Sequence, residues 1–357
     1  MPGRGRVYDE RDVRVRPSRR GTRPRTKERP AHDDAVVGMV TAVDRGRWTT
    51  LVPADAAGPE RVVIAMRARE LGRSPVVVGD EVGMVGDTSG VEGSLARIVR
   101  IQERRTLLRR TADDTDPFER AIVANADQLV VVSALANPEP RPRLIDRCLV
   151  AAYDAGLDPL LVLTKSDLAS GEDFLAQYAP LDVPHVTTAV LEPGSEGLAA
   201  LQQRLAGRMS VLVGHSGVGK STLVNALVPD AGRAIGHVND VTGRGRHTST
   251  SAVGLRLPPL DGSDDAQGED TPSSGWIIDT PGIRSFGLAH VEPDRIIGHF
   301  PELSRGAEEG CPRGCTHDEP DCGLDEWVEQ GHAGPNGEQR LDSFRRLLRA
   351  RTPQTGD

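Results

Sequence analysis

The sequence of 357 residues contains few aromatic side chains, few cysteines and no long apolar run. Phe, Tyr and Trp together make up 3% of the chain, which argues against a nucleic-acid surface built from stacked aromatic rings. No apolar segment approaches the ~18 residues of a membrane span, and the Arg-rich N-terminus lacks the apolar part of a signal peptide. We therefore expect a cytoplasmic protein with no membrane partner.

Lysine is also scarce, because only Lys27, Lys165 and Lys220 are lysines among 44 basic residues. Lys165 and Lys220 stand in short motifs where a compact ammonium on a thin stem is needed, which the planar guanidinium of Arg does not supply. This distribution points to nucleotide chemistry.

Positive charge is concentrated at the N-terminus. Residues 1–32 hold eleven Lys and Arg against four Asp and Glu, although the whole chain has a net charge of −8. The segment has almost no bulky apolar residues, so we predict a disordered basic arm over 1–33. Two interpretations stay open, an arm that binds nucleic acid by releasing counterions from phosphates and a tail that only improves solubility.

Short β-rich runs separated by turn residues follow over 34–101 and predict a small barrel. An OB-like fold is favoured because such barrels often present a nucleic-acid-binding face, and an SH3-like or other structural β module is the alternative. The predicted strands are 36–41, 48–52, 61–65, 80–85 and 96–101.

Residues 102–117 are polar without periodicity and are predicted to be a linker. From 118 to 290, strands and helices alternate, which indicates a mostly parallel sheet with right-handed crossovers. Residues 291–357 are expected to form short helices around a cysteine cluster, ending in the basic run 340–351. The predicted fold class is therefore multidomain: a barrel, an α/β domain and a small helical domain. The expected strands of the α/β part are 128–133, 159–163, 185–189, 210–213, 252–257 and 276–278, and its helices are 143–155, one at 174–175, 196–205 and 222–227.

A phosphate-binding loop is predicted between the strand at 210–213 and the following helix. Its glycines let backbone N–H groups surround phosphates, Lys220 reaches the outer phosphates, and the Ser221 hydroxyl binds Mg²⁺. An ordinary Gly-rich turn is the weaker alternative. The residues are Gly214, His215, Ser216, Gly217, Val218, Gly219, Lys220 and Ser221, with Thr222 next in the helix.

Asp279 and Gly282 belong to an Asp-Thr-Pro-Gly sequence that closes a later strand. Alone, an Asp at a strand end is a common structural feature. Beside a phosphate-binding loop, Asp279 is expected near Mg²⁺, and Gly282 can offer its N–H to a γ-phosphate. The pair predicts a nucleoside triphosphatase.

The sequence Thr164-Lys165-Ser166-Asp167 resembles the Asn-Lys-x-Asp base-recognition motif of GTPases. One carboxylate can accept from both N1–H and the 2-amino group of guanine, whereas adenine would leave Asp167 unpaired, so GTP is favoured. Thr164 stands where Asn is usual, and a hydroxyl cannot form both hydrogen bonds of an amide. A cap for the following helix is the structural alternative.

Residues 243–250 lie where a switch loop is expected. One threonine there should bind Mg²⁺ when a γ-phosphate is present, and we favour Thr250 over Thr248. Ile283 occupies the place of a water-orienting Gln in many GTPases. His247 is the candidate for that role, against an exposed loop histidine.

The base motif precedes the phosphate-binding loop, whereas GTPases usually have the reverse order. This order predicts a circularly permuted GTPase domain. Its second switch, 283–288, would then lead directly into the cysteine-rich unit, which nucleotide state could move.

Three thiolates and one imidazole form a cluster with the spacing Cys-x3-Cys-x-His-x4-Cys. They make a complete tetrahedral set for one structural Zn²⁺ per chain, with a redox or incidental group as the alternative. The ligands are Cys311, Cys315, His317 and Cys322. Cys148 lies in an apolar helical run and is expected in the core.

Over roughly 34–330, the sequence resembles the ribosome small-subunit-dependent GTPase A family, RsgA or YjeQ. The likeness rests on the motif order, the segments 122–128 and 243–248, and the Cys/His cluster. It implies an OB-fold, a permuted GTPase domain and a zinc domain that act in late maturation of the small ribosomal subunit. It also implies 16S rRNA contact, GTP hydrolysis to GDP stimulated by that subunit, and catalysis by His247. The cysteine spacing departs from the family's usual Cys-x4-Cys-x-His-x5-Cys.

Two other functions stay open: a signalling or metabolic GTPase with a protein partner, and an RNA-binding module that turns nucleotide over slowly. No heptad pattern argues for an oligomer, so a monomer is the default.

Overall fold

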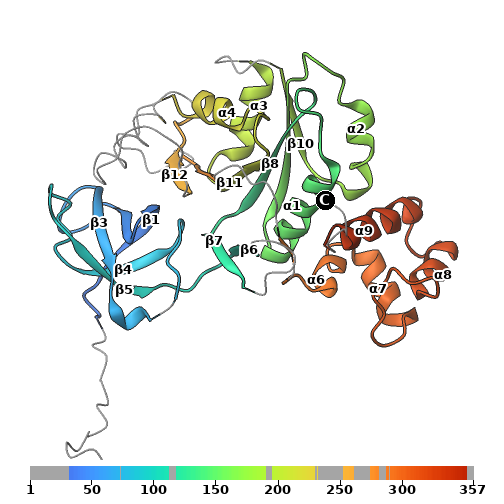
Figure 1. Ribbon diagram of the computed structural model, residues 1–357, viewed down its shortest axis with the longest axis horizontal. Helices are drawn as coiled ribbons and strands as arrows, with labels where there is room; N and C mark the ends of the chain where they lie inside the picture. The colour runs from blue at the N-terminus through green and yellow to red at the C-terminus, as the bar shows by residue number, and fades with distance from the viewer. Residues whose placement is uncertain are drawn as a thin grey trace, which may run out of the picture. The chain divides into compact units, whose positions relative to one another are not determined.

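The computed structural model describes residues 32–72, 74–111, 118–189, 195–229, 231, 252–260, 274–280, 287–288 and 290–351. Its elements follow the three predicted regions: a strand-rich part, an alternating α/β part and a helical C-terminal part (Figure 1). None of the helices within these ranges combines the length and the apolar character needed to cross a membrane. Most of the predicted basic arm, the predicted switch loop and Gly282 lie outside the described residues.

The strand-rich part is a closed β-barrel. Its strands pair in the order β1-β2-β3-β5-β4, and β4 pairs back with β1. β3 and β5 are parallel, and the other pairs are antiparallel. All five predicted strands are present, and the OB-like barrel is confirmed. They are β1 (Val36–Asp44), β2 (Arg47–Val52), β3 (Arg61–Arg67), β4 (Glu81–Gly86) and β5 (Ala96–Ile101), with a short 3-10 turn at Arg69–Leu71.

Residues 102–117, predicted to be a linker, contain a strand. β6 (Leu107–Arg110) pairs antiparallel with β7 (Arg120–Ala124) in a separate two-stranded sheet. The sequence did not indicate β6 because its apolar part is only Leu107 and Leu108, too short to show a period of two. Leu108 is nevertheless buried, because it packs in the same apolar core as the buried residues of α1 (Pro142–Ala155).

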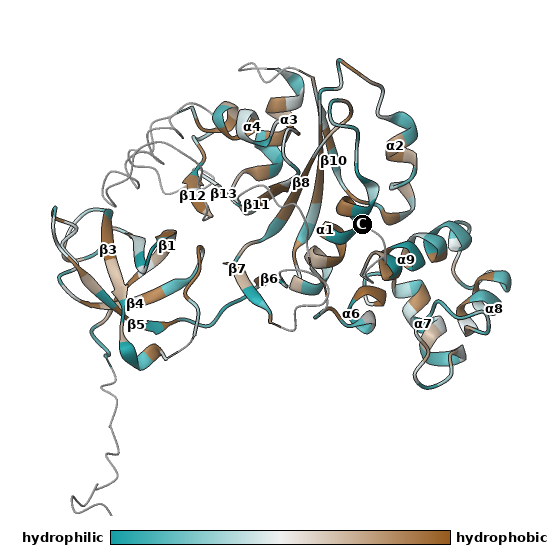
Figure 2. Ribbon diagram, viewed as in Figure 1, coloured by the Kyte–Doolittle hydropathy of each residue, from teal (hydrophilic) through white to brown (hydrophobic). Residues whose placement is uncertain are grey.

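The central part is a parallel sheet with one antiparallel edge, as predicted. Its order is β10-β9-β8-β11-β13-β12, and only β12 runs antiparallel to its neighbour β13. All seven residues of β8 are buried, and Figure 2 shows mostly hydrophobic colours along β8 and β11. The strands are β8 (Gln128–Ala134), β9 (Asp158–Thr164), β10 (His185–Thr188), β11 (Met209–Gly214), β12 (Val253–Arg256) and β13 (Trp276–Asp279).

Helices cover both faces of this sheet. α3 (Glu196–Leu205) and α4 (Lys220–Leu227) share one apolar core with alternate strand residues, and α1 and α2 (Glu172–Ala176) share the other. Alternation of side chains along each strand produces the two cores. Cys148 on α1 is buried as predicted, and burial raises the pKa of its thiol to about 12.

The barrel and the central sheet are joined through backbone pairing. β1 of the barrel pairs with β12, where Ala42 lies opposite Val253. Close by, the buried Asn125 side chain donates to the Gly79 carbonyl of the barrel at 2.9 Å. Gly79 has a φ of +87°, and a Cβ there would lie 2.0 Å from the Ala124 oxygen, so no other residue fits. The two regions therefore share one continuous hydrogen-bonded sheet.

Four helices form the C-terminal part around an apolar centre. Phe300 and Phe344 lie 5.4 Å apart between ring centroids, and Leu303, Leu324 and Leu347 are fully buried around them. The helices are α6 (Pro293–Ile297), α7 (Pro301–Gly310), α8 (Gly323–Glu329) and α9 (Gly337–Arg351). This agrees with the predicted short helices around the cysteine cluster.

Candidate functional site

The predicted phosphate-binding loop connects β11 to α4 at the carboxyl end of the parallel sheet. Gly217 and Gly219 have φ angles of +85° and +90°, a conformation that favours glycine. Gly214 is enclosed, since a Cβ would lie 2.7 Å from the Val132 carbonyl oxygen. His215 is half-buried, and its Nδ1 lies 2.9 Å from the Ser216 carbonyl oxygen. The loop thus has the tight turn and the following helix N-terminus that bind phosphate.

Lys220 and Asp279 meet at the base of this loop. Lys220 is 8% exposed, and its ammonium forms an ion pair with the Asp279 carboxylate and donates to the Thr280 carbonyl at 2.6 Å. The Thr280 hydroxyl in turn donates to the Leu212 carbonyl at 2.7 Å, which ties the end of β13 to β11. Residues 59 positions apart are therefore held at one corner.

This corner has the donor types that suit a magnesium ion. Ser221 follows Lys220 in the first turn of α4 and is exposed, and Asp279 ends β13. Mg²⁺ prefers hard oxygen ligands such as a hydroxyl and a carboxylate, and it commonly keeps several waters. Ser221 and Asp279 would hold the ion, and Thr222 lies exposed beside them on α4.

The base motif at the end of β9 lies against the phosphate-binding loop. Thr164 is 2% exposed, and its hydroxyl donates to the Val218 carbonyl at 2.6 Å. The Lys165 ammonium donates to the Gly217 carbonyl at 3.0 Å and also to the Asn137 carbonyl. Two motifs more than 50 residues apart therefore meet through consecutive carbonyls of one loop.

Asp167 is left open to solvent by these contacts. Its side chain is exposed and has no hydrogen bond or ion pair within the described part of the chain. The Ser166 N–H donates to the Thr188 carbonyl at 3.3 Å, which fixes the motif to the end of β10. The end of β10 therefore lies next to the base motif.

Two contributors to this corner were missed from the sequence, Asn137 and Thr280. Asn137 lies in the turn between β8 and α1, with a φ of +48°, and accepts from Lys165 through its carbonyl. Backbone carbonyls leave no trace in residue identity, so only the Asn-Pro turn signal could have drawn attention to it. The predicted catalytic residues His247 and Thr250, and Gly282, lie outside the described residues.

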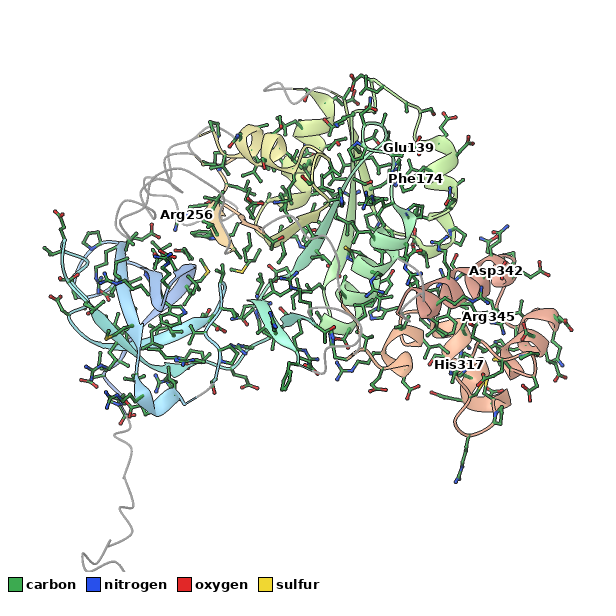
Figure 3. All side chains as sticks on the ribbon, viewed as in Figure 1. Glu139, Phe174, Arg256, His317, Asp342 and Arg345 are labelled. Carbon is green, nitrogen blue, oxygen red and sulfur yellow. The ribbon has the colours of Figure 1, made fainter. Side chains whose placement is uncertain are left out.

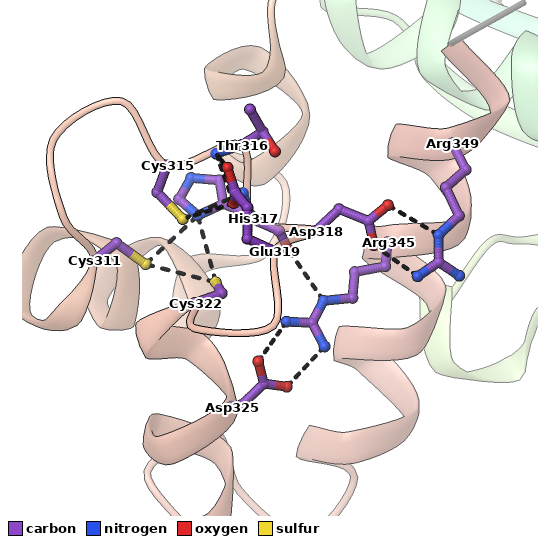
Figure 4. A network of polar contacts seen from close by, with 10 residues as sticks. All are labelled: Cys311, Cys315, Thr316, His317, Asp318, Glu319, Cys322, Asp325, Arg345 and Arg349. Atoms are coloured by element: carbon purple, nitrogen blue, oxygen red, sulfur yellow. Dashed lines mark hydrogen bonds and ion pairs between the residues drawn. The ribbon is translucent and has the colours of Figure 1, made fainter.

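The four predicted zinc ligands converge in the loop before α8 (Figure 4). Their ligand atoms all lie within 4.8 Å of one another. The Sγ atoms of Cys311 and Cys322 are 3.8 Å apart, and Cys311 Sγ lies 3.5 Å from His317 Nδ1. A tetrahedral zinc site with Zn–S bonds of about 2.3 Å has S–S edges of about 3.8 Å. The cluster therefore fits a closed structural zinc site.

Local backbone conformation brings these ligands together. Gly314 has a φ of +83° in the turn between the first two cysteines, and the Cys315 N–H donates to the Pro312 carbonyl at 3.2 Å. His317 is itself left-handed, with a φ of +66°, which turns its ring back toward the thiols. Burial raises the pKa of the Cys315 thiol to about 12, so binding of a metal at neutral pH would release a proton.

A second set of contacts holds the metal loop against α9 (Figure 4). Arg345 donates to the His317 carbonyl at 3.0 Å and pairs with both carboxylate oxygens of Asp325 at 2.7 Å. Arg349 pairs in the same two-point manner with Asp318. Figure 3 places Arg345 and His317 close together in this helical part. Hydrogen bonds of this kind fix the backbone carbonyl of His317, and with it the metal loop, in one orientation.

Two further arginines of α9 contact the central domain or α7. Arg346 lies 3.2 Å from the buried carboxylate of Asp146 on α1, and its guanidinium lies 4.9 Å from the Tyr178 ring centroid. Arg340 pairs with Glu302 of α7 and donates to the Pro180 carbonyl at 2.6 Å. All four arginines at 340–349 therefore have intramolecular partners.

Three arginines of the barrel differ from those of α9, because they are exposed and have no partner in the described part of the chain. Arg47 on β2 lies opposite Met66 on β3, which lies opposite Arg97 on β5, and all three side chains are exposed. Arg45 occupies the adjoining β1–β2 turn. Within the described ranges, the guanidinium groups of Arg45, Arg47 and Arg97 have no ion pair or hydrogen bond. We call these three residues the barrel arginines.

Comparison with known proteins gives one consistent family. The family model described as RsgA GTPase matches residues 101–289. The Small ribosomal subunit biogenesis GTPase RsgA of Pseudomonas putida is 43% identical over 235 residues, which is 64% of this chain and 63% of that protein. The protein of the same name from Pseudomonas aeruginosa is 38% identical over 289 residues, 78% of this chain and 77% of that protein.

Two solved structures have a similar fold. YjeQ from Thermotoga maritima matches with a TM-score of 0.57 and 25% identity, covering 89% of this chain and 99% of its own. YloQ, described as a circularly permuted GTPase, matches with a TM-score of 0.57 and 20% identity, covering 91% and 99%. The order of motifs in this chain agrees with a permuted fold.

Proposed function

This chain belongs to the RsgA GTPase family, and on that premise we propose that it hydrolyses GTP to GDP and phosphate on the small (30S) ribosomal subunit and assists late maturation of that subunit. A cytoplasmic location follows from this partner. The names of the Pseudomonas relatives, which state small-subunit biogenesis, support the proposal.

The contact that carries the GTPase assignment is the one between base motif and phosphate-binding loop. Thr164 and Lys165 hold the loop at 2.6 and 3.0 Å, and Asp167 remains free beside it. A nucleotide lying along this line would place its phosphates at Lys220 and its base at Asp167. Guanine offers Asp167 two N–H donors, at N1 and at the 2-amino group, and adenine has no donor at either position.

Each residue then has a distinct task. Lys220 and the loop N–H groups stabilise negative charge on the phosphates, and Asp167 selects the base. Bound Mg²⁺, held by Ser221, Asp279 and Thr250, would neutralise charge on the outer phosphates. His247 orients the attacking water in place of a Gln, with the Gly282 N–H on the γ-phosphate.

The barrel arginines support 16S rRNA as the partner of the barrel. Arg45, Arg47 and Arg97 are exposed and unpaired within the described part of the chain, which is the arrangement that meets a phosphate backbone. The helical C-terminal domain holds one structural Zn²⁺ and packs against the GTPase domain. The protein acts as a monomer. Its role on the subunit is to position these elements.

The decisive experiment measures GTP hydrolysis by the full chain, alone and with isolated small or large ribosomal subunits. We expect strong stimulation by the small subunit only. A His247→Ala variant should bind the subunit as before and lose the stimulation, because water positioning is lost while binding is kept.

Two outcomes would replace this function. Hydrolysis that neither subunit stimulates, with partner binding insensitive to salt, would favour a GTPase with a protein partner. A Lys220→Ala protein that still supports subunit maturation would favour an RNA-binding module with slow turnover.

A further inference from the structure

Thr164 can donate only one hydrogen bond, and that bond is already made. Its hydroxyl lies 2.6 Å from the Val218 carbonyl oxygen, and the side chain is 2% exposed. The alternative acceptor, the Ser133 carbonyl, is 3.4 Å away and is also protein. A hydroxyl has one hydrogen, whereas the amide of an Asn at this position would have two. Thr164 therefore has no donor left for a nucleotide base.

Lys165 uses two of its three ammonium N–H donors on the protein itself. Its ammonium donates to the Gly217 and Asn137 carbonyls on two different loops. The side chains of Thr164 and Lys165 therefore both hold the phosphate-binding loop. Of Thr164, Lys165 and Asp167, Asp167 is the one whose side chain is exposed and makes no hydrogen bond or ion pair within the described residues, so it is free to contact a base.

We propose that the base site recognises guanine through its N1–H and 2-amino edge alone and does not recognise N7. This inference rests on the proposed GTPase function. A guanine held by Asp167 turns its opposite edge, which carries the N7 acceptor, toward the end of β9 and the loop that Thr164 holds. An acceptor there needs a donor. Thr164 is thus a positioning residue for the phosphate-binding loop, and its identity sets which edge of the base is recognised.

The test compares GDP with 7-deaza-GDP, in which a C–H group replaces N7, by titration calorimetry on the full-length protein. We expect the two dissociation constants to agree within about 2-fold. A 7-deaza-GDP affinity about 5-fold or more below that of GDP, the effect of one lost hydrogen bond, would overturn the inference.

Variants at position 164 test the assignment to this residue. Thr164→Asn supplies a second donor, so 7-deaza-GDP should bind about 5- to 10-fold more weakly than GDP to this variant. Equal binding of both nucleotides to Thr164→Asn would overturn the role of residue 164. Thr164→Val should weaken both nucleotides by the same factor, and Thr164→Ser should restore binding because it keeps the hydroxyl.

Failure of the inference is separable from failure of the proposed function. A protein that prefers ADP, or binds no GDP, contradicts the GTPase assignment. A protein that binds GDP and rejects 7-deaza-GDP contradicts only the N7 inference. Asp167→Asn provides the positive control for base reading, because it should shift preference from GDP toward xanthosine diphosphate.

Discussion

Two groups of arginines in this molecule have the same charge and opposite surroundings. The α9 arginines, Arg340, Arg345, Arg346 and Arg349, each form an ion pair with Asp or Glu. The barrel arginines have no such partner within the described part of the chain. In the sequence, 340–351 is the more conspicuous basic run after the N-terminal arm. The structure shows that the four described arginine side chains of this run use their charge internally, while the scattered barrel arginines are exposed.

The comparison also separates two kinds of function. An arginine paired on two points with a carboxylate contributes to architecture, since both groups give up hydration to hold one geometry. An exposed unpaired arginine contributes little to folding and can replace a counterion at a phosphate. The following predictions test whether the two groups behave in these two ways.

Loss of the metal should have the largest effect, because it removes the folded metal loop that Arg345 and Arg349 hold against α9. A structural zinc site supplies roughly 10 kcal/mol or more of binding free energy at neutral pH. Cys322→Ser should reduce bound zinc from one per chain to near zero and unfold the part formed by α7, α8 and α9. Hydrogen exchange, read peptide by peptide together with metal content, measures this. The barrel peptides are the internal control, and an unchanged exchange pattern in α8 and α9 would contradict a structural site.

The burial of Asp146, which pairs with Arg346, should make stability depend on pH. Burial raises the pKa of Asp146 to about 6, against 3.8 for the unperturbed group, although Arg346 acts in the opposite direction. The folded state therefore binds more protons than the unfolded state between these values, and the free energy of unfolding should fall as pH rises from about 4 to 6. The full change is at most about 3 kcal/mol, at 1.36 kcal/mol per pKa unit.

Asp146→Asn should remove this part of the pH profile. Denaturant unfolding of both proteins between pH 4 and 7 measures the difference, with Asp318→Asn as the matched control on an exposed α9 pair. A wild-type profile that is parallel to that of Asp146→Asn over this range would contradict the assignment.

Removing the barrel arginines should affect binding and leave folding unchanged. Each lost phosphate contact lowers the slope of log affinity against log salt by about 0.7 to 0.9, so Arg45→Ala, Arg47→Ala and Arg97→Ala together should lower it by about 2 to 3. The free energy of unfolding should change by less than about 0.5 kcal/mol for each substitution. Dissociation constants for the small subunit at several salt concentrations measure the slope.

The matched control for this experiment is Arg349→Ala on α9. Arg349 is also exposed, but it pairs with Asp318, so its loss should leave the salt slope unchanged. Equal slopes for the triple variant and Arg349→Ala would show that the barrel arginines do not contact phosphate.

Much of the fold was predictable because its elements have strong local patterns. All five barrel strands and the strands of the central sheet were indicated by β-rich apolar runs between turn residues. The hairpin of β6 and β7 was not, since its few apolar residues become buried only against α1. For the site, the sequence predicted the phosphate-binding loop, the base motif and the three Cys and one His that the structure brings together. The hydrogen bond from Thr164 to Val218 could not be predicted, because its acceptor is a backbone carbonyl.

The sequence by itself determined which residue types stand in the motifs: glycines where φ is positive, one lysine at the Gly-rich loop, one carboxylate at the end of the base motif, and three thiols with one imidazole in the cysteine cluster. It also determined their order, with the base motif before the phosphate-binding loop. Only the tertiary structure decided what each charge and each hydroxyl is used for. Arg346 faces Asp146 and Arg47 faces solvent, although both are arginines in charged segments. The reason is that a hydrogen bond or ion pair depends on which groups meet across the fold, and residues far apart in sequence meet only when the chain has packed.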